Sequence, residues 1–70
     1  MERMNLKTYY KNCKKKYEFA GKVAERCGVT LNAVINWCNF YTKPGDNLKM
    51  QILSEESGIP IEDLFNRELN

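Results

Sequence analysis

The tripeptide Gly28-Val29-Thr30 constrains the fold of this chain more than any other stretch, because it separates two short apolar stripes of helical period. The stripe before it has apolar residues at i, i+3, i+4 and i+7, namely Ala20, Val23, Ala24 and Cys27. Gly28 suits the left-handed position that ends a helix, and the Thr30 hydroxyl can cap a second helix beginning at Leu31. Two helices joined by so short a turn must cross. Residues 20–40 therefore predict a helix-turn-helix.

The second helix, predicted from Leu31 to Phe40, has one face for the core and another for a partner. The core stripe recurs at helical spacing and comprises Val34, Trp37, Cys38 and Tyr41. Asn32 and Asn36 lie one turn apart on the other face, beside Leu31. An asparagine amide can bind the N6/N7 edge of adenine, and an apolar tip can contact a thymine methyl, so this face fits base reading in a major groove. Two exposed asparagines without a role are the other interpretation.

The residues from Val23 to Pro44 resemble the Cro/repressor (XRE-type) helix-turn-helix family of phage regulators. The positions that carry the resemblance are Ala24, Gly28, Val29, Thr30, Val34, Trp37 and Pro44. Residues 57–65 are similar to the ending of such domains, and residues 4–10 are similar to the opening of small phage Cro and YdaS-like regulators. The resemblance implies an all-α, lambda-repressor-like compact bundle of about five helices. It also implies that the second motif helix lies in the major groove. The length of 70 residues suffices for one domain, so a single helix-turn-helix domain is expected over residues 1–70.

Four residues depart from the family pattern. Phe40 stands where the family usually has glycine after the recognition helix, and Ile35 occupies a normally polar position. Phe19 stands near the usual serine or threonine cap of the first motif helix. Ala20 replaces the polar residue after that cap, often a glutamine that reaches DNA. These departures concern the family's DNA contacts more than its fold.

Charge is divided unevenly along the chain. Residues 1–50 hold ten Lys/Arg and four Asp/Glu, whereas residues 51–70 hold one Arg and five Asp/Glu. A polyanion would be attracted to the helix-turn-helix half and repelled from the tail. The residues predicted to contact a DNA backbone are Thr30, Lys14, Lys15, Lys16, Thr42 and Lys43.

The first helix is predicted from Leu6 to about Lys16, with Asn5 as its N-cap. Its residues at helical spacing are Leu6, Tyr9, Tyr10, Cys13 and Tyr17. The lysines at positions 14–16 would then lie in its last turn, where cations favour a helix C-terminus and can also face phosphates. A merely solvated lysine cluster is the alternative.

Two apolar faces are predicted on the fourth helix, which Asp46 or Asn47 can cap and Gly58 can end. The core stripe of this helix comprises Met50, Leu53, Ser54 and Ser57, and a short last helix follows with Ile61, Leu64 and Phe65 on one face. Leu48 and Ile52 lie on nearly the opposite side of the fourth helix. The pair indicates a second contact, for which a homodimer is one interpretation and isolated exposed apolar residues the other.

Several classes of protein are not expected from this sequence. No apolar run approaches the roughly 20 residues that cross a membrane, and no signal-peptide pattern is visible, so we expect a cytoplasmic protein without membrane contact. The chain has no histidine, and Cys13, Cys27 and Cys38 lack CxxC spacing, so neither a metal site nor a cofactor is expected. The cysteines fall on apolar stripes and are interpreted as small, reduced, buried hydrophobes. Without a histidine base or a nucleophile motif, we expect neither an enzyme nor a small-molecule substrate.

The favoured hypothesis is a sequence-specific DNA-binding transcriptional regulator of the Cro/repressor type, whose partner is double-stranded DNA. It would act alone, as a repressor or an activator, or as an antitoxin-like autoregulator. The alternative is a protein-interaction module, an antirepressor or antitoxin-like partner binder, on the same scaffold without DNA binding. The formal net charge of only +2 and the apolar Ile35 and Phe40 near the reading face favour this alternative.

Overall fold

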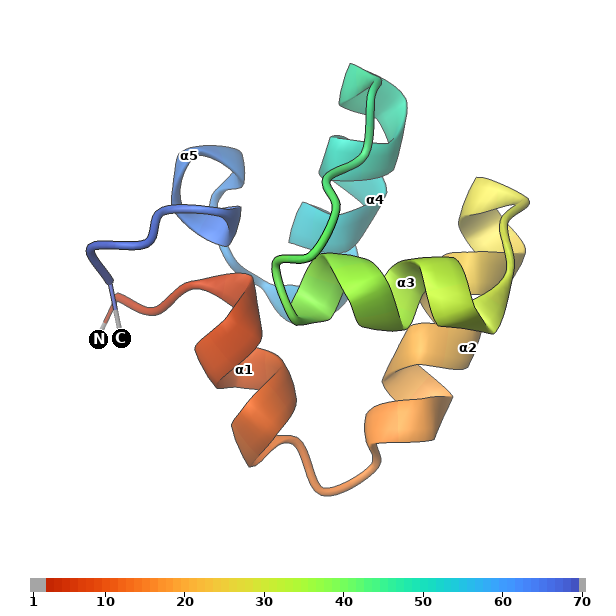
Figure 1. Ribbon diagram of the computed structural model, residues 1–70, viewed down its shortest axis with the longest axis horizontal. Helices are drawn as coiled ribbons and strands as arrows, with labels where there is room; N and C mark the ends of the chain where they lie inside the picture. The colour runs from red at the N-terminus through yellow and green to blue at the C-terminus, as the bar shows by residue number, and fades with distance from the viewer. Residues whose placement is uncertain (1–2, 70) are drawn as a thin grey trace.

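Five helices make up the part of the chain that the computed structural model describes, residues 3–69 (Figure 1). They are α1 Leu6–Asn12, α2 Lys16–Cys27, α3 Leu31–Cys38, α4 Asn47–Ser57 and α5 Ile61–Leu64. No strand occurs within these residues. The Cα radius of gyration, 10.7 Å, is close to the roughly 11 Å expected of a compact chain of this length. The predicted compact all-α bundle of about five helices is confirmed.

The core lies where α2 packs against both α3 and α4, while α1 packs against α3 and α5. Its buried apolar residues are Leu6, Tyr10, Phe19, Ala20, Val23, Ala24, Val34, Trp37, Cys38, Ile52, Leu53, Ile59 and Leu64. The predicted core stripe of α3 is therefore confirmed at Val34, Trp37 and Cys38. It is wrong at Tyr41, which follows the helix and is 78% exposed.

The junction between α2 and α3 has the predicted geometry. Gly28 is left-handed with φ 70°, and its N–H and that of Val29 both donate to the Ala24 carbonyl, at 2.9 and 3.1 Å. The Thr30 side chain caps α3 by accepting from the Ala33 N–H at 3.2 Å. A Cβ at position 28 would meet no atom within 4 Å, so glycine is favoured there by backbone conformation and not by lack of space. One helix ends and the next begins within three residues.

The boundary between the first two helices differs from the one that the sequence predicts. α1 ends at Asn12 instead of about Lys16, and α2 begins at Lys16, about one turn before the predicted start of the motif. The reason is Phe19, which is buried in the first turns of α2 with its ring edge-on to Tyr9, 5.1 Å between centroids. Burying this ring requires the chain to turn before it. Tyr17, which helical spacing predicts on the same face as Leu6 and Tyr10, is 71% exposed, whereas those two residues are buried.

The predicted exposed pair on α4 is wrong for one of its members. Leu48 is 67% exposed, but Ile52 is only 7% exposed. Because α4 packs against both α2 and α5, it buries a wide arc that includes Ile52 and Leu53, which project about 100° apart. The ends of α4 are as predicted, with the Asp46 side chain as N-cap and Gly58 left-handed at φ 77°. Ile52 belongs to the core, so it cannot form a self-association surface with Leu48.

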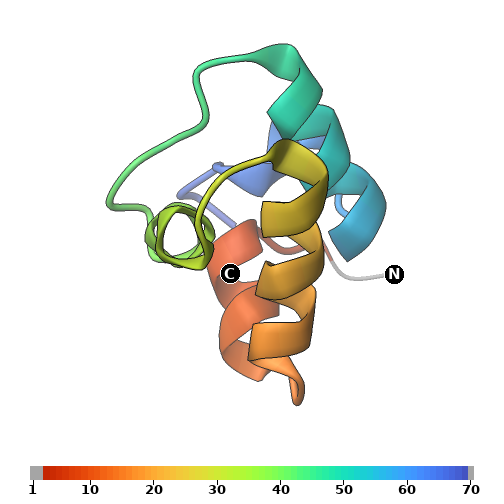
Figure 2. The ribbon, with the colours of Figure 1, turned by 90° about the vertical axis from the view of Figure 1, so that its right-hand side faces the viewer.

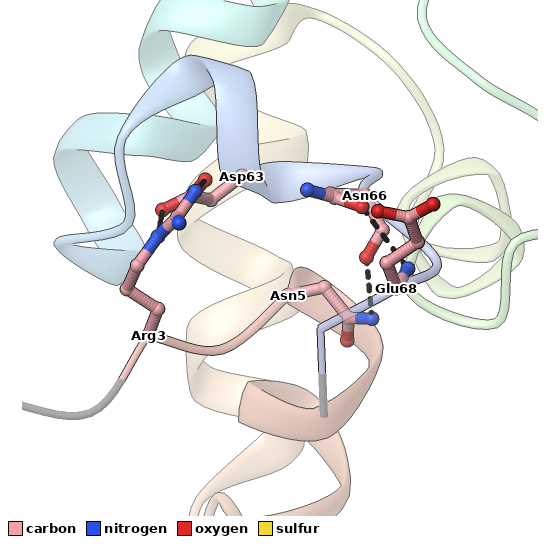
Figure 3. Close-up of polar contacts among 5 residues, drawn as sticks. All are labelled: Arg3, Asn5, Asp63, Asn66 and Glu68. Carbon is pink, nitrogen blue, oxygen red and sulfur yellow. Dashed lines mark hydrogen bonds and ion pairs between the residues drawn. The ribbon is translucent and has the colours of Figure 1, made fainter.

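The two ends of the described chain are tied together by polar contacts that the sequence did not predict (Figure 3). Asn5 caps α1 as expected, and its amide also donates to the Asn66 and Leu69 carbonyls, at 2.9 and 2.7 Å. The Arg3 guanidinium donates two hydrogen bonds to Asp63, whose side chain is only 4% exposed. These bonds hold the pKa of Asp63 below its ordinary value. The C-terminal segment is thereby fixed against the start of α1.

Candidate nucleic-acid interface

α3 lies at the edge of the molecule and carries the residues predicted to read bases. In Figure 1 it runs across the molecule, and in Figure 2 it is seen end-on at one side, with the loop of residues 39–46 beyond it. Val34, Trp37 and Cys38 fill its inner side. Leu31 and Asn32 are exposed on its outer side.

The amides of Asn32 and Asn36 are free for a partner. Asn32 is exposed and Asn36 is half-buried. Within residues 3–69 the side-chain hydrogen bonds of α3 and its caps belong to Thr30 and Asn39, and neither the Asn32 nor the Asn36 side chain has a partner. The neighbouring Asn39 differs, because its amide donates to the Ile35 carbonyl at 3.1 Å. Each free amide offers two N–H donors and one acceptor oxygen. Together with Leu31, which is 41% exposed, α3 presents two hydrogen-bonding groups and an apolar tip, and it contains no charged residue.

Three of the predicted backbone contacts stand at the two ends of α3. Thr30 is exposed at the N-terminal end, and its capping oxygen leaves the hydroxyl hydrogen able to donate to an anion. Thr42 and Lys43 are exposed on the loop that follows the C-terminal end. The structure therefore places these three residues on either side of the amides that α3 presents.

The lysines at positions 14–16 lie elsewhere. They occupy the turn between α1 and α2 and the first residue of α2, at the far tip of this helical hairpin from α3 in both views (Figures 1 and 2). Lys15 Nζ is 3.6 Å from the Glu18 carboxylate, and Lys16 Nζ is 5.7 Å from the centroid of the Tyr10 ring. The prediction that they end a helix is wrong because α1 stops before them. The structure does not bring Lys14, Lys15 or Lys16 together with the loop after α3.

α3 ends in a left-handed residue that is not glycine. Phe40 has φ 64°, the only positive φ of a non-glycine residue within residues 3–69. The Tyr41 N–H donates to the Asn36 carbonyl at 2.9 Å and the Phe40 N–H to the Trp37 carbonyl at 3.1 Å, the paired bonds of a Schellman helix end. The helix therefore stops at Cys38 and not at Phe40 as predicted. Phenylalanine therefore adopts here a left-handed conformation that glycine adopts most readily.

Three cations gather around Phe40 and its neighbour Phe65, whose ring centroids are 5.4 Å apart. Lys7 Nζ is 6.0 Å and Arg67 Cζ is 5.5 Å from the Phe40 centroid, and Lys43 Nζ is 5.7 Å from the Phe65 centroid. Arg67 also donates to the Phe40 carbonyl at 3.3 Å. We call these five residues the cation–aromatic cluster. Of its three cations, sequence reasoning singled out only Lys43, because Lys7 and Arg67 come from opposite ends of the chain and no periodicity connects them to α3.

The cysteines differ in burial. Cys38 is fully buried, and this burial raises the pKa of its thiol to about 12. Cys13 and Cys27 are half-buried against the core, so the prediction of buried thiols is confirmed only at Cys38. In the described part of the chain, no group of three Cys, Asp or Glu side chains is arranged to hold a metal ion. None of the helices there combines the length and apolar character that crossing a bilayer requires.

Comparison of the chain with protein-family models, with curated proteins and with solved structures gives no significant match. The functional interpretation of α3 therefore depends on the chemistry of its own residues.

Proposed function

We propose that this chain is a sequence-specific DNA-binding regulator in which α3 enters the major groove of double-stranded DNA. The observation that carries the proposal is the outer face of α3, where the amides of Asn32 and Asn36 have no internal partner and stand beside the apolar tip of Leu31. These groups match the edges of adenine and thymine in the major groove. The resemblance to Cro/repressor helix-turn-helix proteins supports the docking geometry, in which the second motif helix lies in the groove.

The residues at the two ends of α3 would position the DNA backbone. Thr30 lies at one end of α3, and Thr42 and Lys43 follow the other end, so the residues at each end can meet a phosphate on one side of the groove. Such contacts carry no sequence information, but they fix the register in which the amides meet the bases. Base reading and backbone positioning would thus belong to different residues.

A protein-interaction module is the second candidate, and one observation favours it. Leu31 is 41% exposed and Tyr41 is 78% exposed, so large apolar surface borders both ends of the outer face of α3. Aromatic and apolar side chains of this kind are enriched where proteins meet one another. This candidate predicts binding that changes little with salt, because it does not depend on phosphate contacts.

A salt titration against a random-sequence duplex separates the two candidates. With a labelled duplex of about 20 base pairs, roughly two helical turns, the logarithm of the binding constant should fall linearly with the logarithm of salt concentration. Absence of binding at low salt would reject the DNA proposal and favour the protein-interaction module. Selection of bound duplexes from a random pool would then give the preferred site, and a palindromic site would mean that two copies of the chain bind together.

Two alanine variants test the division of roles. Asn36→Ala should weaken binding to the selected site by about 1 to 3 kcal/mol and leave the affinity for random duplex nearly unchanged. Lys43→Ala should weaken binding to the selected site and to random duplex alike, and it should lower the salt slope by about 0.9. Asn12→Ala, at the exposed last residue of α1, is the matched control and should bind as the wild type does. Equal losses at both duplexes for Asn36→Ala would mean that α3 does not read bases.

A further inference from the structure

The reading helix has no cation of its own, although phosphate contacts supply most of the affinity of a protein for DNA. Residues Leu31–Cys38 include neither lysine nor arginine. The cations near its N-terminal end are occupied: Arg26 bonds Glu55 and Glu56, at 2.7 and 2.8 Å, and Lys49 pairs with Asp46 at 2.7 Å. The cations beside α3 that form no salt bridge within residues 3–69 lie at its other end.

The cation–aromatic cluster lies at that other end and is not neutralised. Within residues 3–69, neither Lys7, Lys43 nor Arg67 forms a salt bridge with a carboxylate. Lys7 and Arg67 both lie against the Phe40 ring, so two like charges share one aromatic side chain. The ring and the carbonyls at the C-terminal end of α3 attract these cations, but an anion between them would relieve their mutual repulsion.

Arg67 has unused capacity for such an anion. One of its nitrogens donates to the Phe40 carbonyl, which leaves most of the five N–H groups of the guanidinium free. The side chain borders two shallow hollows on either side of Phe40, of about 430 and 320 Å³. Arg67 is also the only basic residue in the acidic stretch 51–70. The fold brings this one cation of the tail to the end of α3.

We propose that the cation–aromatic cluster is a phosphate-binding site that holds the DNA backbone where it leaves the groove occupied by α3. The inference rests on the proposed function and extends the contact surface beyond Lys43 to Lys7 on α1 and Arg67 on the C-terminal segment. The guanidinium meets a phosphate oxygen with its free N–H groups, and the two lysines add point charges on either side. Phe40 and Phe65 hold the three cations in place.

Salt titrations of single variants test the site. The duplex is the random-sequence duplex of about 20 base pairs, and the variants are Arg67→Ala, Lys7→Ala and Arg67→Lys. Each alanine variant should lower the salt slope by about 0.9 and weaken binding about fivefold near physiological salt, whereas Arg67→Lys should keep most of the slope. Lys22→Ala is the matched control, because Lys22 is an exposed lysine that borders a different hollow with Tyr9 and Phe19. It should leave the slope unchanged.

The outcomes separate this inference from the function on which it rests. Loss of slope in Arg67→Ala and Lys7→Ala with an unchanged Lys22→Ala supports the site. A wild type that binds duplex while Arg67→Ala keeps the full slope overturns the site and leaves the proposed function standing. An equal loss in Lys22→Ala also overturns it, since net charge alone would then account for the effect. A wild type that binds no duplex overturns both.

Discussion

Phe40 offers the sharpest test of the helix end that positions the loop after α3. Phe40 has a left-handed backbone with φ 64°. In this region a residue with a side chain is less stable than glycine by about 1 to 2 kcal/mol, so the phenylalanine occupies an unfavourable conformation. Two variants separate the backbone from the ring. Phe40→Ala removes the ring and keeps the unfavourable backbone, whereas Phe40→Gly removes the ring and relieves the backbone.

The magnitudes follow from the burial of the ring. Phe40 is half-buried, so removing its ring in either variant loses roughly 100 Å² of buried apolar surface, about 2.5 kcal/mol of stability. Both variants also lose the contact with the Phe65 ring, about 0.5 to 1 kcal/mol. Phe40→Gly recovers the stability that the left-handed backbone costs an L-residue, but it loses about 0.4 to 1 kcal/mol because glycine gives the unfolded chain more conformational freedom. We therefore expect Phe40→Ala to be destabilised by about 3 to 3.5 kcal/mol and Phe40→Gly by about 2 to 3 kcal/mol, with glycine the more stable by about 0.5 to 1 kcal/mol.

Urea unfolding followed by tryptophan fluorescence measures this difference, because Trp37 is the only tryptophan and is 6% exposed. With a slope of about 1 kcal/mol per molar urea, the Phe40→Gly midpoint should lie about 0.5 to 1 M above that of Phe40→Ala. In an ordinary helical position alanine would be favoured over glycine by about 1 kcal/mol. A Phe40→Ala variant as stable as Phe40→Gly would therefore refute the left-handed assignment.

Three further predictions follow from single groups. Gly21→Ala should raise the thermal midpoint, because position 21 is helical with open space around it, whereas Gly28→Ala should lower it through the left-handed backbone, each by about 1 kcal/mol in stability. The hydrogen bonds from Arg3 lower the pKa of Asp63 in the folded protein. Their contribution to the free energy of unfolding is therefore present above about pH 4 and is lost as the pH falls through that lowered pKa. Asp63→Asn should accordingly lose less stability than the wild type on acidification below pH 4, as thermal melts would show. Cys38, with its pKa raised to about 12 by burial, should resist alkylation at pH 8 in the folded protein, while urea should make it reactive in a mass-spectrometric assay.

The sequence predicts the helix ends well where the signal is local. Gly28 and Gly58 take left-handed conformations, and the side chains of Asn5, Thr30 and Asp46 accept capping hydrogen bonds, as their residue types favour. The three side-chain caps join residues three apart, and each glycine N–H donates to a carbonyl four residues before it, so a short stretch of sequence contains the whole motif.

The errors arise where tertiary packing decides. No glycine or proline marks the break between α1 and α2, and the break follows from the burial of Phe19 against Tyr9. Helical spacing assigns one inner face to α4, but two neighbouring elements bury Ile52 as well. The left-handed backbone of Phe40 was not predicted either, because a phenylalanine gives no local signal for it.

The candidate site divides in the same way. The face of α3 that bears Asn32 and Asn36 follows from helical spacing alone and could be predicted. The cation–aromatic cluster could not be predicted in this way. Lys7 and Arg67 come together at the end of α3 only because hydrogen bonds from Asn5 hold the two ends of the described chain side by side. Only a fold places these two residues beside the same ring.

The uncharged face of α3 has a consequence for specificity. If the cations at its C-terminal end make the phosphate contacts, they do so on any duplex, whereas Asn32 and Asn36 distinguish one sequence from another without releasing counterions. The salt slopes for the selected site and for random duplex should then be nearly equal, and the ratio of the two affinities should stay nearly constant between about 50 and 200 mM salt. Parallel titrations of both duplexes measure that ratio. A ratio that changes steeply with salt would mean that some cations reach phosphates only in the specific complex, so that reading and positioning are not carried by separate residues.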